Sequence, residues 1–133
     1  MTTICAYAAT LVLFLAADMV WLGTMTGRFY RPVLGDLLLA KPNLLPAAVF
    51  YLSYPVGLVI FAVMPGLRGG GVTQAAIWGA LFGLFTYATY DLTNQATLRN
   101  WSSMLTVVDV AWGTILGAFA ASGATWIAGR LTS

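Results

Sequence analysis

The chain has 133 residues, of which 60% are hydrophobic and 8% are charged, and its formal net charge is +2. Soluble domains carry roughly 45–50% apolar and about 25% charged residues, so this composition cannot supply a water-facing surface. It contains no histidine and one cysteine, Cys5, which excludes an intrachain disulfide and argues against a metal site built from these residue types. We therefore expect an integral membrane protein without a metal or a cofactor.

Four apolar segments are long enough to cross a bilayer. A helix needs about 20 mostly apolar residues to span the hydrocarbon, and the pattern predicts such helices at residues 4–25, 44–64, 75–92 and 105–127. The first segment lacks a basic n-region and is too long for a signal peptide, so we interpret it as a helix. We expect one integral membrane domain over residues 1–133, an all-α bundle of four transmembrane helices with short loops.

The distribution of basic residues predicts the orientation. In a four-span protein the loops at 27–43 and 93–103 share one side of the membrane, and the loop at 65–71 shares the other side with the chain ends. The first side carries Arg28, Arg31, Lys41 and Arg99, whereas the second carries Arg68 and Arg130. Because cytoplasmic loops are enriched in Lys and Arg, we expect a bacterial inner-membrane protein with both termini in the periplasm.

Three of the four acidic residues lie in or against these spans. Asp18 is seven residues before the end of the first helix, hence ~10 Å inside the membrane at 1.5 Å per residue. Asp91 ends the third helix, and Asp109 lies one turn into the fourth. All three belong to the same half of an up-down bundle. An ionised Asp in lipid costs roughly 2.5–3.5 kcal/mol at the bilayer centre, so we expect these side chains to face the bundle interior.

Aromatic and amide side chains accompany these acids. Tyr87, Tyr90, Asp91 and Asn94 follow one another at i, i+3, i+4 and i+7, which places them on one helix face. The second helix adds two tyrosines in the same half of the membrane. We therefore predict a ligand-binding pocket formed by Asp18, Trp21, Tyr51, Tyr54, Tyr87, Tyr90, Asp91, Asn94, Asp109 and Trp112. The alternative is that these groups are interhelical hydrogen-bonding partners, each contact contributing roughly 0.6–2 kcal/mol.

Two spacings recur in the helices. Asp18-x-x-Trp21 and Asp109-x-x-Trp112 each place an acid and an indole nearly one turn apart, so that the indole N–H can orient the carboxylate of its own motif. G-x-x-x-G pairs begin at residues 23, 79 and 113. Small residues at this spacing let helices approach closely, either inside one molecule or in a homodimer, and we favour the former.

Motifs for familiar chemistries are missing from the sequence. It has no P-loop, no G-x-S-x-G elbow, no Cys–His pair and no basic patch for nucleic acid. The expected partners are membrane lipids, a small amphipathic ligand or a second copy of the chain. No residue is assigned a catalytic role, and we lean against an enzyme.

The whole chain resembles a family of small bacterial membrane proteins known as domain of unknown function 2177. The resemblance rests on the two D-x-x-W motifs, on Pro46-Ala47-x-x-Phe50-Tyr51, on Gly79-Ala80-x-x-Gly83 and above all on Tyr87-x-x-Tyr90-Asp91-Leu92-Thr93-Asn94. It implies a four-helix membrane protein and assigns no activity to any residue.

Three functions are compatible with these features. The first is a binding protein or accessory subunit that holds a lipid-like or small amphipathic ligand in the Asp/Tyr pocket. The second is a proton-coupled small transporter that uses the membrane aspartates. The third is a membrane enzyme acting on a lipid, with aspartates as acid and base. A transporter needs access from both sides, and the half of the bundle away from the aspartates is almost wholly apolar.

Overall fold

The computed structural model describes residues 1–39, 41 and 43–132, and these residues form helices and no strand. The long helices are α1 (Thr2–Met25), α3 (Leu44–Leu58), α4 (Gly71–Thr97) and α5 (Ser103–Thr132). Shorter helical pieces join or extend them: η1 (Thr26–Tyr30), α2 (Arg31–Leu34), η2 (Gly35–Leu37), η3 (Val59–Val63) and η4 (Gly66–Gly70). The predicted all-α membrane bundle is confirmed.

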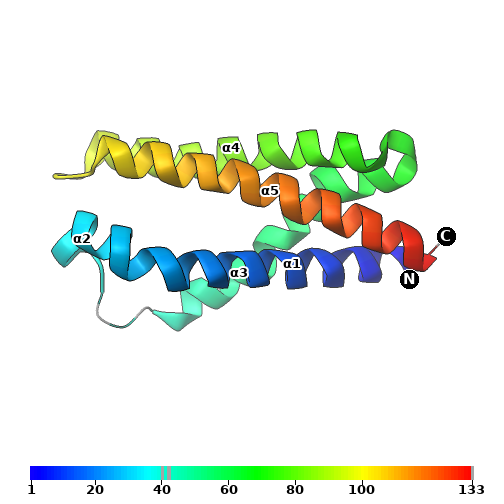
Figure 1. Ribbon diagram of the computed structural model, residues 1–133, viewed down its shortest axis with the longest axis horizontal. Helices are drawn as coiled ribbons and strands as arrows, with labels where there is room; N and C mark the ends of the chain where they lie inside the picture. The colour runs from blue at the N-terminus through cyan, green and yellow to red at the C-terminus, as the bar shows by residue number, and fades with distance from the viewer. Residues whose placement is uncertain (40, 42, 133) are drawn as a thin grey trace.

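Within the described chain, three continuous helical segments are long and apolar enough to cross a membrane: Thr2–Leu37, Leu44–Thr97 and Ser103–Thr132. The second has 54 residues and would be about 81 Å long if straight, far more than a bilayer needs. It reverses direction at η4, where Gly69 and Gly71 have φ values of 126° and 82° that favour glycine. The segment therefore contains both predicted spans, α3–η3 and α4, and both termini lie at one end (Figure 1).

The helices are longer than predicted, and the first loop is partly helical. The predicted loop at 27–43 continues the helical path of α1 through Leu37 before Asn43 caps α3 by accepting a hydrogen bond from the Leu45 amide at 3.3 Å. Pro32 lies in the first turn of α2, where a missing N–H is tolerated. Hydropathy locates the residue at which the side chains become polar, and the helical hydrogen bonds of the backbone continue beyond that residue.

Packing of α4 against α5 depends on glycine. A side chain at Gly83 would collide with the Gly113 carbonyl, and one at Gly79 with the Gly117 carbonyl. These two G-x-x-x-G motifs therefore hold one intramolecular helix pair together. Helix α1 packs on α5, while the α3–η3 arm crosses obliquely, with α3 against α1 and η3 against α4 (Figure 1).

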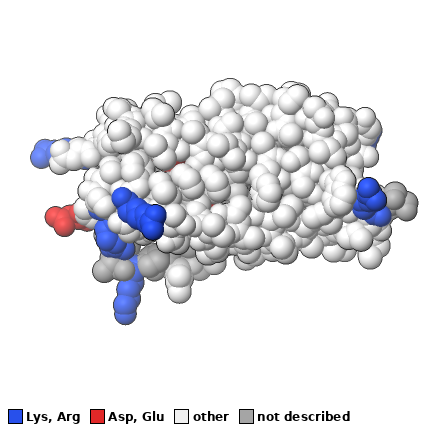
Figure 2. Space-filling model, viewed as in Figure 1, with Lys and Arg blue, Asp and Glu red and all other residues white. Residues whose placement is uncertain are grey.

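The two halves of the bundle differ in polarity. The half near the termini has an apolar core of small and branched side chains: Ala6, Val59, Ala62, Val63, Ala121, Ala124 and Ala128. The half near α2 holds the membrane aspartates, and Lys and Arg side chains gather at its tip (Figure 2). A polar region is thus enclosed between a dry core at one end and a basic surface at the other.

Candidate functional site

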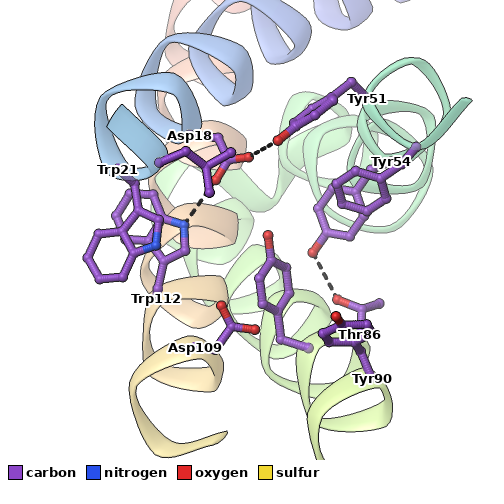
Figure 3. Close-up of a pocket in the computed structure, with 11 residues that line it drawn as sticks. Asp18, Trp21, Tyr51, Tyr54, Thr86, Tyr90, Asp109 and Trp112 are labelled. Carbon is purple, nitrogen blue, oxygen red and sulfur yellow. Dashed lines mark hydrogen bonds between the residues drawn. The ribbon is translucent and has the colours of Figure 1, made fainter. Parts of the chain in front are cut away.

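Asp18 of α1 is held by two helices that come from distant parts of the chain. Its side chain is 5% exposed. The Tyr51 hydroxyl of α3 donates to Oδ2 at 2.5 Å, and the Trp112 indole Nε1 of α5 donates to Oδ1 at 3.2 Å (Figure 3). Both carboxyl oxygens therefore have a donor, and this one residue links three helices.

Asp109 of α5 has a different partner. The Tyr30 hydroxyl donates to Asp109 Oδ1 at 2.6 Å, and Trp21 Nε1 donates to the Tyr30 oxygen at 2.9 Å. The Trp21 and Trp112 rings are stacked, with centroids 4.3 Å apart and planes 4° from parallel. The two indoles thus serve the opposite D-x-x-W motifs, Trp112 directly at Asp18 and Trp21 through Tyr30 at Asp109, and the expectation that each indole serves its own aspartate is wrong. Helices α1 and α5 run antiparallel (Figure 1), and stacking of the two indoles between them places the Trp112 N–H beside Asp18 of α1.

Tyr30 was missed by the sequence reasoning because it lies in the predicted first loop. The structure continues α1 into η1, and this extra turn carries Tyr30 to Asp109, 79 positions away along the chain. Its neighbours include Arg28 and Arg31 and follow no membrane-helix pattern, so neither hydropathy nor helical periodicity singles it out.

Asp91 of α4 is the most deeply buried of the three acids. It is 0% exposed, and neither of its carboxyl oxygens has a hydrogen-bond partner among the described residues. Its side chain lies beside the carboxyl of Asp109. Both acids line a cavity of about 210 Å³ together with Tyr30 and Trp101. Among the described residues, Asp91 Oδ1 and Oδ2 are the buried side-chain atoms that receive no hydrogen bond from a hydroxyl or N–H group.

A larger cavity of about 400 Å³ lies next to it and shares Leu22, Tyr90 and Asp109 with the smaller one. It is lined by Asp18, Trp21, Leu22, Phe50, Tyr51, Tyr54, Thr86, Tyr87, Tyr90, Asp109 and Trp112. Figure 3 shows the stacked indoles with Asp18 and Asp109 on one side and Tyr51 and Tyr54 on the other. The Tyr54 and Thr86 hydroxyls are hydrogen-bonded at 2.9 Å. The walls are therefore aromatic rings interrupted by carboxyl and hydroxyl oxygens.

Eight of the ten predicted site residues line the larger cavity: Asp18, Trp21, Tyr51, Tyr54, Tyr87, Tyr90, Asp109 and Trp112. Asp91 lines the smaller cavity instead. Asn94 lines neither and lies beside the Tyr90 side chain. Phe50, Thr86 and Leu22 were not predicted as site residues, since an isolated Phe, Thr or Leu in a membrane helix carries no signal for a site.

The donors and acceptors of the site are tyrosine hydroxyls, an indole N–H and carboxyl oxygens. No group of three or more His, Cys, Asp or Glu side chains in residues 1–39, 41 and 43–132 is arranged to hold a metal ion. The cavity offers ring faces, tyrosine hydroxyls and carboxyl oxygens, which suit contact with an apolar body that carries a polar group.

Fold and site together define a polytopic α-helical membrane protein that encloses an acidic, aromatic cavity in one half of its bundle. The chain belongs to the family described as predicted membrane protein (DUF2177), whose model matches residues 3–126. No curated protein and no solved structure matches it.

Proposed function

We propose that this protein binds a small amphipathic or lipid-like molecule in the larger cavity. The observation that carries the proposal is a cavity of about 400 Å³, lined by aromatic rings and two carboxyls, within membrane-spanning helices. Ligand sites in proteins typically have volumes of roughly 300–1,000 Å³ and combine apolar walls with a few convergent polar groups. A purely structural hydrogen-bonding network would need no such space between its members.

The rim of the cavity supports access from the bilayer. Phe50 on α3 and Tyr90 on α4 line the cavity, yet they are 40% and 57% exposed. In this half of the molecule α3 packs against α1, and it contacts α4 through Tyr54, which is hydrogen-bonded to Thr86 one turn away from these two rings. A molecule dissolved in the lipid would meet these two rings first and pass between α3 and α4.

The apolar core near the termini favours binding over transport through one molecule. Ala6, Ala62 and Val63 are 0% exposed and pack with the α5 alanines across the bundle. Moving a polar ligand through this region would separate closely packed helices. Catalysis has weaker support than binding, because both oxygens of Asp18 are already engaged by Tyr51 and Trp112.

The proposed setting is the bacterial inner membrane, with both termini in the periplasm and the α2 end in the cytoplasm. Four basic residues at the α2 end against two at the other support this orientation. A homodimer remains a second proposal. Of the three G-x-x-x-G motifs, the pair Gly23 and Gly27 has open space where a second copy could pack.

Native mass spectrometry of gently extracted protein tests the binding proposal. Wild type is expected to retain a small molecule that survives removal of bulk detergent. Leu22→Trp is expected to release it, because Leu22 lines the cavity and the larger ring fills that space. Val12→Trp is the matched control, since Val12 lies on the same helix and is 63% exposed. An unliganded wild type, or equal retention in Leu22→Trp, would contradict the proposal.

A further inference from the structure

The charge of the larger cavity is one-sided. Asp18 and Asp109 are among its lining residues, and no Lys or Arg is. The partners of these two carboxyls within the described chain are the phenols of Tyr51 and Tyr30 and the indole of Trp112, all neutral groups. Buried charges in proteins are generally paired, because an unpaired one loses its hydration without compensation. When they are ionised, these carboxyls have no positive partner among the lining residues of the cavity.

The rings of the cavity are suited to the same kind of partner. The face of an aromatic ring carries negative electrostatic potential, and a cation within about 6 Å of a ring centre gains roughly 0.5–2 kcal/mol. Trp21 and Trp112 are stacked beside the two carboxyls, and Tyr51 and Tyr54 lie opposite them (Figure 3). A cation between these walls would meet aromatic rings and carboxyl oxygens together.

The neighbouring carboxyl pair adds a third observation. Asp91 is 0% exposed, no hydroxyl or N–H group of the described residues donates to its oxygens, and its carboxyl lies within hydrogen-bonding reach of the Asp109 carboxyl. Because Asp109 lines both cavities, a positive group near Asp109 would also attract the carboxyl group of Asp91. The Asp91–Asp109 carboxyl pair thus adjoins the larger cavity and adds negative charge there when it is ionised.

We propose that the ligand is an amphipathic organic cation, an ammonium group attached to an apolar chain or ring system, with its charged group between Asp18 and Asp109. This inference rests on the proposed binding function and names the chemical class of its ligand. A zwitterionic phospholipid fits less well, because its phosphate would find no Lys or Arg among the lining residues. An anionic amphiphile would be repelled by both carboxyls.

Three probes with the same alkyl chain and different charge test this inference. Decyltrimethylammonium, decyl sulfate and decanol are titrated separately into the protein in a neutral polyoxyethylene detergent, and the bound fraction is measured by native mass spectrometry. The cation is expected to bind at least about tenfold more tightly than the other two, equivalent to about 1.4 kcal/mol. Preference for the sulfate or for decanol would overturn the inference.

Variants then assign the preference to the cavity. Asp18→Asn and Asp109→Asn are each expected to weaken binding of the cation several-fold and leave decanol unchanged. Asp36→Asn is the matched control, because it removes the same charge outside both cavities. Phe50→Leu removes a ring from the exposed rim without touching the hydrogen bonds of Asp18, and it too should weaken the cation selectively. A preference unaltered by all three cavity variants would overturn the assignment.

The outcomes separate this inference from the proposed function. Equal binding of the three probes, lost in Leu22→Trp, would overturn the cationic ligand and leave the binding cavity intact. Absence of binding by every probe, together with an unliganded wild type, would overturn both. Circular dichroism of each variant identifies loss of fold, and the exposed rim variant Phe50→Leu keeps the test decisive if an Asp→Asn change unfolds the protein.

Discussion

The three membrane carboxyls differ in what the protein donates to them. Asp18 receives two hydrogen bonds, Asp109 receives one from Tyr30, and Asp91 receives none from the described residues. Donation from Tyr51 and Trp112 makes Asp18 a structural junction between α1, α3 and α5 as well as part of the cavity wall. The three acids therefore differ in how far they serve as hydrogen-bonding links between helices and how far they are open to a ligand. Asp18 is the one that links the most helices.

Removing the hydroxyl from Tyr51 should destabilise the protein. Tyr51→Phe leaves Asp18 Oδ2 without its donor, and an unsatisfied buried acceptor costs about 1–3 kcal/mol. Tyr7→Phe is the matched control, because Tyr7 donates at 2.9 Å to a neutral acceptor, the Leu52 carbonyl, at an exposed position. Its expected cost is about 1 kcal/mol or less. Reversible unfolding in mixed micelles, followed by circular dichroism, measures both. Equal losses in the free energy of unfolding would show that the hydrogen bond to Asp18 contributes no more to stability than the exposed one made by Tyr7.

At the scale of helices, the site is assembled from an antiparallel pair and an oblique arm. Helices α1 and α5 exchange the indoles of their D-x-x-W motifs, and α3 adds Tyr51 and Tyr54 from the side. Periodicity predicted which face of α4 carries Tyr87 and Tyr90, because a helix repeats every 3.6 residues whatever its neighbours are. Periodicity gives no information on which helix lies opposite, so the exchange of indoles could not be predicted.

The α4–α5 hairpin depends on close backbone approach at glycine. Gly83→Ala should destabilise the protein by about 1–3 kcal/mol, because the added methyl group meets the Gly113 carbonyl and the helices must separate. Gly23→Ala is the matched control. No atom lies within 4 Å of the position that the added methyl group would take, and Gly23 lies in a helix, so alanine should be neutral or stabilising by up to about 1 kcal/mol. Thermal unfolding in detergent compares the two. A tolerated Gly83→Ala would show that the hairpin does not need this contact.

On the scale of the whole molecule, composition and hydropathy were enough to predict a membrane bundle with its acids in one half. They predict where each membrane-spanning segment begins, because burial in hydrocarbon depends on side-chain polarity averaged over about 20 residues. They did not predict that the polar half contains two adjoining cavities or that Tyr30 reaches Asp109. Tyr30 and one wall of the smaller cavity belong to the helical extension after Met25, and the Tyr30–Asp109 hydrogen bond joins this extension to α5.

The orientation of the protein matters for function, because it decides which side of the membrane the acidic cavity lies near. Both termini lie at the end opposite α2 (Figure 1), and the basic residues gather at the α2 end (Figure 2). We expect that end in the cytoplasm. In a Cys5→Ser background, single cysteines at Leu39, Leu98 and Thr132 report the two sides of the membrane when intact cells are treated with an impermeant maleimide.

Thr132→Cys is expected to react in intact cells, whereas Leu39→Cys and Leu98→Cys should react only after the cells are permeabilised. Leu39 and Leu98 are 63% and 44% exposed, so poor accessibility in the folded protein would not explain their protection. The reverse pattern would place the carboxyl pair in the periplasmic half and make the ligand one that enters from the outer leaflet. Labelling of Leu39 and Leu98 on opposite sides would contradict the reversal at η4, because both positions lie at the α2 end only if α3–η3 and α4 each cross the membrane once.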